Sequence, residues 1–200
     1  MTLFYRIIRA IANVLTRLFF RVRGYGVHNV PKEGAVIMCC NHTSISDIFF
    51  MAILCPRQIH FMGKDELFKN KLIAWLFTKL GAFSVNRRTG DKGAINRAEE
   101  ILGEGKVMGI FPEGTRYPGD APHKAKPGAA MLALTTKATI LPCSIYRDTG
   151  KVKFLQKATF RFGNPVSFEE YGSENVGKTE IRRVSELITE KITELWEMKH

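Results

Sequence analysis

Residues 41–47 form the first of two segments whose residue types and spacing could do chemistry. They read NHTSISD, so Asp47 follows His42 by five positions, just after a run expected to form a buried strand. An imidazole can take the proton of a hydroxyl group, and a carboxylate can orient the imidazole and stabilise its charged form. Thr43 or Ser44 is expected to cap the following helix and so to direct Asp47 toward the loop. Taken alone, the spacing also fits a loop histidine unrelated to an aspartate in the first turn of a helix.

Residues 111–116, FPEGTR, form the second segment and follow another apolar run. Pro112 and Gly114 are typical turn formers. Thr115 can donate a hydrogen bond to an oxygen, and Arg116 can hold a phosphate through two parallel hydrogen bonds. For Arg116 considered by itself, a solvated arginine in an ordinary turn is the alternative.

Short apolar runs alternate with helical segments along the chain, which is the pattern of an α/β sheet protein. Strands are expected over 35–40, 59–62, 82–85, 107–111 and 140–145, with the last strands within 152–162. Helices are expected over 44–55, 69–80, 91–102, 128–136 and 179–198. Two hundred residues with 45% hydrophobic content suffice for one compact domain, and no repeat or linker interrupts them. The predicted fold is a single-domain mixed β-sheet flanked by helices.

Residues 1–23 are predicted to form an amphipathic basic helix. Apolar residues recur at helical spacing from Leu3 to Val22, five arginines interrupt them, and no acidic residue occurs before Glu33. No uninterrupted apolar run is long enough to span a bilayer. One interpretation is a helix lying in the lipid headgroup layer, with its apolar face in the acyl chains and its arginines on lipid phosphates. The alternative is an ordinary helix that covers the core. Arg9 divides the apolar segment and no small-residue cleavage site follows, which disfavours a signal peptide.

The charge of the chain points to an anionic partner. Thirty Lys and Arg residues against nineteen Asp and Glu residues leave a formal net charge of +11. Nucleic acid, an acidic carrier protein, phosphate ligands and a negatively charged membrane would all satisfy this charge. The sequence has no helix-turn-helix, aromatic RNA-stacking or zinc-binding pattern, so no nucleic-acid partner is predicted.

The four cysteines predict neither disulfides nor a metal site. They lie in apolar stretches without a CxxC pair: Cys39, Cys40, Cys55 and Cys143. This pattern favours buried thiols in a reducing compartment, which points to the cytosolic side of a membrane. No cluster of ligand residues predicts a metal ion.

With both segments identified, the chain resembles the 1-acyl-glycerol-3-phosphate acyltransferase family, also called lysophosphatidate acyltransferases, whose HX4D motif is similar to residues 42–47. Four further blocks are similar to the family and occur in its order: KDEL at 64–67, GAFSVNR at 81–87, KPGAA at 126–130 and ILPCSI at 140–145. The resemblance covers about residues 25–165. It divides the chain into an amphipathic membrane-associating helix, 1–23, and an acyltransferase domain, 24–200.

The resemblance implies a reaction and a set of site residues. The chain would transfer a fatty acyl group from acyl-CoA or an acyl carrier protein to the free sn-2 hydroxyl of 1-acyl-glycerol-3-phosphate (lysophosphatidic acid), giving phosphatidic acid. His42 would be the general base and Asp47 its orienting partner. Substrate-binding roles would fall on six residues, three for the phosphate or headgroup and three that shape the acceptor site: Lys64, Arg87 and Arg116, and Glu113, Gly114 and Thr115. No cofactor is implied besides the acyl donor, which is a substrate.

Two departures from the family pattern bear on these expectations. Asn86 stands where the family often has an acidic residue, and Arg88 follows Arg87 directly, so which of the two arginines faces the site stays open. The N-terminus lacks the long hydrophobic spans of some relatives. The protein is therefore expected to rest on the cytoplasmic face of the membrane as a peripheral protein.

Three alternatives accompany this prediction. The chain could acylate a different lysolipid, or it could bind anionic lipids without catalysis, although the presence of His42, Asp47 and Arg116 argues against a mere binder. In a third, Cys40 takes the acyl group first as a thiolate. Cysteines that end an apolar strand usually pack inertly, which disfavours this covalent route.

Overall fold

The computed structural model describes residues 2–85, 92–118, 121–147, 157–173 and 175–198. Seven strands of this part of the chain form one sheet in the order β1-β7-β6-β2-β5-β3-β4. Their bounds are β1 Arg21–Tyr25, β2 Val36–Cys40, β3 Ile59–Lys64, β4 Ala82–Val85, β5 Val107–Ile110, β6 Thr139–Tyr146 and β7 Lys157–Phe162. The sheet is mixed: β6 and β7 pair antiparallel, and all other neighbours pair parallel. Strands β2 to β6 therefore run in one direction and end at one edge.

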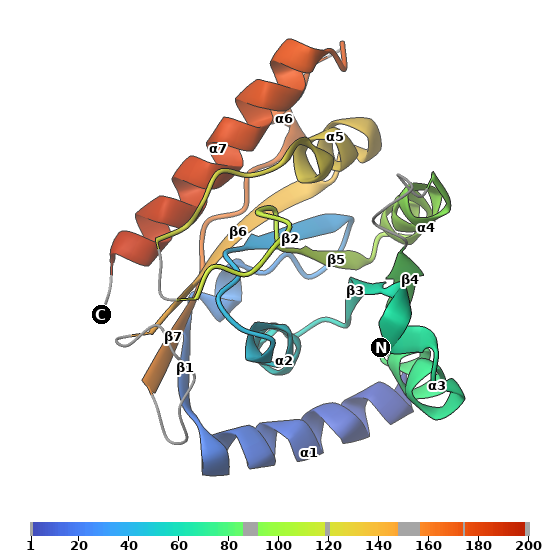
Figure 1. Cartoon of the computed structure of the whole chain (residues 1–200). Coiled ribbons are helices and arrows are strands. Elements are labelled where there is room, and N and C mark those ends of the chain that lie inside the picture. The colour runs from blue at the N-terminus through green and yellow to red at the C-terminus, as the bar shows by residue number, and fades with distance from the viewer. Residues whose placement is uncertain (1, 86–91, 119–120, 148–156, 174, 199–200) are drawn as a thin grey trace.

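Helices cover both faces of this sheet (Figure 1). α1 and α2 lie on one face, and α4, α5 and α7 lie on the other, while α3 sits beside β4. The bounds are α1 Leu3–Phe19, α2 Ser46–Leu54, α3 Lys71–Lys79, α4 Lys92–Gly103, α5 Pro127–Thr136, α6 Phe168–Tyr171 and α7 Lys178–Glu197, with 3-10 turns at Val27–Asn29 and Asp65–Phe68.

Strand β2 is buried on both faces because the helices enclose it. Val36, Met38 and Cys40 pack toward α2, whereas Ile37 and Cys39 pack toward α5 and α7. All five side chains are completely buried. A fully covered central strand reads as a continuous apolar run, which is why the sequence predicted it correctly.

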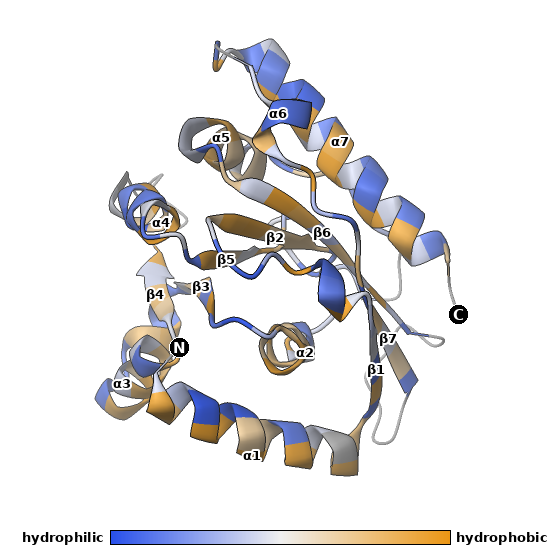
Figure 2. Cartoon of the chain, turned by 180° about the vertical axis from the view of Figure 1, so that it is seen from behind, coloured by the Kyte–Doolittle hydropathy of each residue, from blue (hydrophilic) through white to orange (hydrophobic). Residues whose placement is uncertain are grey.

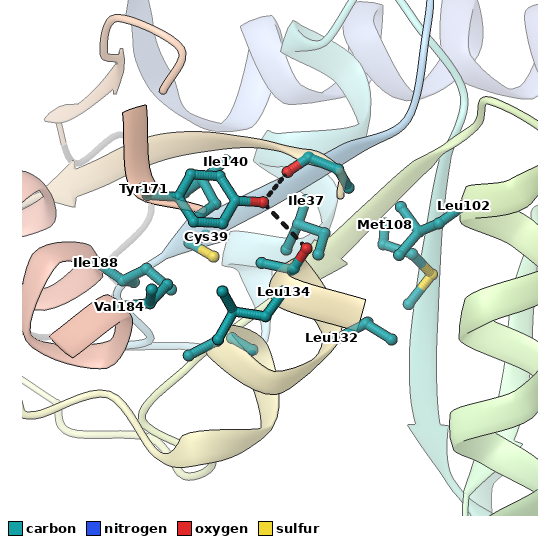
Figure 3. Close-up of a cluster of buried hydrophobic side chains, with 14 of the residues drawn as sticks. Ile37, Cys39, Leu102, Met108, Leu132, Leu134, Ile140, Tyr171, Val184 and Ile188 are labelled. Atoms are coloured by element: carbon teal, nitrogen blue, oxygen red, sulfur yellow. Dashed lines mark hydrogen bonds between the residues drawn. The ribbon is translucent and has the colours of Figure 1, made fainter. Parts of the chain in front are cut away.

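Tyr171 closes the core on the α5 and α7 side, where Figure 3 shows its ring among aliphatic side chains. Its hydroxyl hydrogen-bonds to the carbonyl oxygens of Ala133 (3.1 Å) and Ala138 (2.5 Å). Both carbonyls lie where α5 ends and β6 begins. The short helix α6 thus fixes the joint between α5 and β6, two elements whose other ends lie at the candidate site.

The mixed sheet flanked by helices is the predicted fold, with two differences at its N-terminal edge. The first helix ends at Phe19 rather than near residue 23, because residues 21–25 form strand β1. β1 was not predicted as a strand: it alternates charged residues with Val22, and it becomes a strand by pairing with β7. Strand β7 lies within the range predicted for the last strands, and residues 152–156 of that range lie outside the described residues.

Candidate active site

The carboxyl ends of the parallel strands bring the predicted residues together at one edge of the sheet. His42 follows β2, residues 111–116 follow β5, and Lys64 is the last residue of β3. β6 lies next to β2 and is followed by Arg147. In open α/β sheets the carboxyl ends of the strands are where ligands bind.

His42 and Asp47 are in direct contact. His42 Nδ1 lies 3.1 Å from Asp47 Oδ2, and the Asp47 side chain is fully buried while that of His42 is 14% exposed. An ionised carboxylate only accepts hydrogen bonds, so the contact places the imidazole proton on Nδ1. Nε2, the nitrogen remote from Asp47, is then the atom that can accept a proton.

The loop between the two residues agrees with its prediction in part. α2 begins after Ile45, which makes no side-chain cap, and the Asp47 carboxylate itself accepts hydrogen bonds from the backbone N–H groups of Thr43 (2.7 Å) and Ser44 (2.8 Å). The Ser44 hydroxyl accepts a hydrogen bond from the N–H of Ser46, the first residue of α2 (3.3 Å), so the predicted cap is confirmed for Ser44 and not for Thr43. The aspartate binds the free N–H groups of the loop, and these bonds hold its carboxylate toward His42.

Glu113 connects this loop to the loop after β5. It is buried, and its two oxygens accept hydrogen bonds from the backbone N–H groups of His42 (3.0 Å) and His123 (2.9 Å). Burial raises the pKa of Glu113, and the two hydrogen bonds offset this only in part. The Tyr117 N–H donates to the His42 carbonyl at 2.8 Å. Glu113 thus acts on the site by fixing the position of His42.

Arg147 is the residue of this site that the sequence interpretation missed. Its Nη2 lies 2.5 Å from Asp47 Oδ1, and only 3% of its side chain is exposed. Burial opposes ionisation of Asp47, but the hydrogen bond to His42 and the charge of Arg147 outweigh it and lower the pKa of the carboxyl. The available signal was an arginine two residues after the strand predicted over 140–145.

A cavity of about 480 Å³ opens beside His42. Phe111 stacks on the His42 ring with centroids 3.8 Å apart and also lines the cavity. The rest of the apolar lining comes from α2, from strands β3, β4 and β5, and from helices α4 and α5: Ile48, Phe61, Met62, Val85, Ile95, Ala98, Ile110, Met131 and Leu132. Most of the side chains that line this cavity with His42 are therefore apolar.

Polar side chains line the same cavity. Lys64, Thr115 and Arg116, all predicted to bind substrate, are among them, together with Gly114. Gly114 has φ +73°, a left-handed conformation that suits glycine and that the predicted turn requires. Lys126 also lines the cavity; the family-like block at 126–130 contained it, but no role was assigned to it.

Among the described residues, Glu113 and Cys40 do not line this cavity, although Glu113 was predicted to bind substrate. Arg87 and Arg88 lie outside the described residues, so the choice between them stays a prediction. Cys40 is completely buried, and burial raises the pKa of its thiol well above the ordinary value. The thiol is therefore protonated, which opposes a role as a nucleophile.

A second surface feature is helix α1, whose apolar side faces away from the protein. Its inward side carries buried Tyr5 and also Arg9, whose guanidinium donates to the Ile53 carbonyl (3.1 and 3.0 Å) and so is not free for lipid. Seven outward residues are 43–70% exposed: Leu3, Ile7, Ile11, Val14, Leu15, Leu18 and Phe19. Among the described residues, no helix has both the length and the apolarity needed to span a bilayer.

Comparisons with known proteins agree on one kind of relative. Residues 21–146 match the sequence model of the family described as Acyltransferase. The chain is 29% identical over 177 residues to a 1-acyl-sn-glycerol-3-phosphate acyltransferase of Bacillus subtilis, with 87% of each chain covered. It is 32% identical over 142 residues to a lyso-ornithine lipid O-acyltransferase of Pseudomonas aeruginosa, covering 70% of this chain and 53% of that one.

A solved structure is similar over nearly the whole chain. The crystal structure of the 1-acyl-sn-glycerophosphate acyltransferase PlsC from Thermotoga maritima has a TM-score of 0.76 and 26% sequence identity with it. The match covers 98% of this chain and 79% of that one. The similarity thus includes the sheet, the helices on both faces and the edge at which His42 lies.

Proposed function

The chain belongs to the acyltransferase family, and from this premise we propose that it acylates the free sn-2 hydroxyl of 1-acyl-glycerol-3-phosphate, giving phosphatidic acid. The observation that carries the proposal is the contact between His42 and buried Asp47, with His42 lining a cavity that Lys64 and Arg116 also line. The names of the relatives are those of O-acyltransferases of phospholipid synthesis.

In the proposed reaction, Nε2 of His42 takes the proton of the acceptor hydroxyl as its oxygen attacks the carbonyl carbon of an acyl thioester. The tetrahedral intermediate then collapses, the carbon–sulfur bond breaks, and the proton passes from His42 to the leaving thiolate. Asp47 holds the ring and stabilises the imidazolium between the two transfers. The new ester and a free thiol are the products, and no covalent acyl-enzyme is formed.

The cationic side chains of the cavity suit the phosphate of such a substrate, and its apolar side chains suit the hydrocarbon chain. Lys64, Arg116 and Lys126 supply cations for the acceptor phosphate, which forms strong charge-assisted hydrogen bonds. The apolar lining of the cavity suits a hydrocarbon chain. The donor thioester is carried either by coenzyme A or by an acyl carrier protein, and both are anionic partners for a chain of net charge +11.

The outward side of α1 supports docking on the cytoplasmic face of an anionic membrane as a peripheral protein. A helix lying in the headgroup layer buries its apolar side in acyl chains. Exposed apolar side chains continue beyond α1: Trp75 of α3 is in ring contact with Phe4, and Ile45 and Phe49 flank Asp47. The docked enzyme would receive its lysolipid from the bilayer surface.

The direct test measures thiol release from an acyl thioester with and without 1-acyl-glycerol-3-phosphate. Release that depends on the lysolipid is expected, and His42→Ala should lower it by about 10²–10⁴-fold because the general base is lost. His28→Ala, at an exposed position away from the cavity, is the matched control and should keep the wild-type rate. A folded His42→Ala variant with wild-type turnover overturns the mechanism.

Because one relative is named a lyso-ornithine lipid O-acyltransferase, the identity of the acceptor lipid needs a test of its own. Arg116→Ala should weaken use of the phosphate-bearing acceptor by about 10-fold, the worth of one hydrogen bond to a charged group, and should affect a lysolipid without phosphate less. Saturation curves for both acceptors check this. Equal losses would make Arg116 a structural residue, and faster acylation of lyso-ornithine lipid by the wild type would change the proposed acceptor.

A further inference from the structure

Arg147 is a buried cation placed behind the catalytic pair, on the opposite side of Asp47 from His42. The ion pair between Arg147 Nη2 and Asp47 Oδ1 is 2.5 Å long, and neither side chain is more than 3% exposed. Nη2 also donates to Ser46 Oγ at 3.1 Å, and Nη1 donates to Thr43 Oγ1. Every one of these partners belongs to the 41–47 loop and its helix.

The two carboxylate oxygens of Asp47 contact different groups. Oδ2 faces His42 Nδ1 and accepts the N–H groups of Thr43 and Ser44, whereas Oδ1 accepts from Arg147. A carboxylate held at both oxygens cannot rotate. If the guanidinium were removed, Oδ1 would be left in the interior without its counter-ion, and a buried carboxylate in that state turns or takes up a proton. In either case it no longer holds the imidazole in one tautomer.

A second set of contacts fixes the position of Arg147 along the strand direction relative to His42. Asn41, directly before His42, accepts from the Ile145 N–H (2.8 Å) and donates to the Ile145 carbonyl (3.0 Å). This pair of hydrogen bonds clamps the end of β2 to the end of β6. The Arg147 guanidinium also lies 5.5 Å from the centre of the Phe50 ring, on α2. These contacts therefore fix the end of the strand that precedes Arg147 relative to the loop that carries His42.

We propose that Arg147 is a positioning residue for acyl transfer, which acts through Asp47 to hold the His42 imidazole in its base form and orientation. The proposal rests on the general-base role of His42 given above. Arg147 faces Asp47, Thr43 and Ser46 rather than the cavity, so it does not contact substrate. Its removal should slow the chemical step and leave substrate binding intact.

The experiment compares kcat and KM in Arg147→Met, Arg147→Lys, Asp47→Asn and the Arg147→Met/Asp47→Asn double variant. Arg147→Met should lower kcat about 100-fold with KM for the lysolipid within about twofold, a loss within the range of general-base catalysis. Arg147→Lys keeps the charge but not the two-pronged fork, so it should recover part of kcat. The double variant should be no slower than Asp47→Asn alone, because Asp47 is the one of the three side chains bound by Arg147 that also hydrogen-bonds to the His42 imidazole.

Arg161→Met is the matched control. Arg161 is also a buried arginine, on the neighbouring strand β7, but its guanidinium lies over the ring of Tyr25 and not beside Asp47. Its kcat should stay within about twofold of the wild type. Thermal melts accompany every variant, and if Arg147→Met does not fold, the kcat and KM of Arg147→Lys decide.

Three outcomes overturn the proposal. A folded Arg147→Met variant with wild-type kcat, or wild-type kcat in Arg147→Lys where Arg147→Met does not fold, removes the positioning role and leaves the proposed reaction standing. Losses that multiply in the double variant make Arg147 independent of Asp47. Wild-type kcat in His42→Ala, measured in the same series, removes the general base itself and with it the function on which this inference rests.

Discussion

The helices at the two ends of the chain turn their apolar sides in opposite directions. α7, at the C-terminus, buries Val184, Ile188 and Ile192 against the sheet. α1, at the N-terminus, presents its apolar stripe outward (Figure 2) and packs on α2, where Arg9 donates to the Ile53 carbonyl. Both helices have the same kind of amphipathic pattern. An apolar stripe thus indicates that a helix meets something apolar, and only the tertiary structure indicates whether that is the protein's own core.

The largest expected effect is on membrane binding, which should require the outward side of α1 and not the exposed apolar residues beside α7. Replacing Ile11 and Val14 by Asp should weaken binding to anionic vesicles by at least 100-fold, because each buried side chain contributes about 1.5–3 kcal/mol in apolar surroundings. Co-sedimentation with vesicles measures this. Val176→Asp/Met198→Asp adds the same charge at exposed apolar positions beside α7 and should bind like the wild type. If the α1 variant stays bound, the docking proposal for α1 fails.

The free energy of unfolding should depend on the apolar side chains of α7 and hardly on those of the outward side of α1. Ile188→Ala in α7 should lower the free energy of unfolding by about 2–5 kcal/mol, because it leaves a cavity in the core. Ile11→Ala in α1 should change it by less than about 0.5 kcal/mol, because the side chain is exposed. Urea unfolding of both variants in the absence of lipid measures the difference. Equal destabilisation would make α1 a core helix.

A smaller effect is expected at Phe49, which is 55% exposed on the helix that carries Asp47. Phe49→Ser should reduce activity on vesicle-borne lysolipid by about 10-fold, the equivalent of losing roughly half of a buried aromatic side chain. Activity on detergent-dispersed lysolipid should change little, since docking no longer limits access. Parallel assays in the two substrate forms measure this, and equal losses would assign Phe49 to the catalytic step instead.

Salt should produce the smallest effect. Each Lys or Arg near an anionic surface contributes about 1 kcal/mol, and high salt screens that term but not apolar burial. Raising the salt concentration should therefore weaken vesicle binding of the wild type only in part, and less than the Ile11→Asp/Val14→Asp change does. Complete release by salt alone would show that arginines such as Arg6, and not the apolar side of α1, hold the protein on the membrane.

Most elements could be predicted because their signal is local. The strand at Ala82–Val85 was predicted with its observed bounds, and the helix at Pro127–Thr136 to within one residue. Strand β1 could not be predicted, because its side chains alternate arginine with apolar or small residues and its partner β7 lies far along the chain. An edge strand of this kind is stabilised by hydrogen bonds to its neighbour more than by burial of its own side chains.

The candidate site divides in the same way. From the sequence, the resemblance to the family motif predicted the pairing of His42 with Asp47, whereas their spacing by itself also fitted two unrelated residues. The structure places the two side chains 3.1 Å apart. The sequence also determined that Arg116 and Lys64 lie at strand ends. Only the tertiary structure decided that Arg147 completes the pair and that α1 faces outward. Arg147 reaches Asp47 because β6 lies beside β2 in the sheet, and strand order is set by long-range pairing that no local pattern encodes.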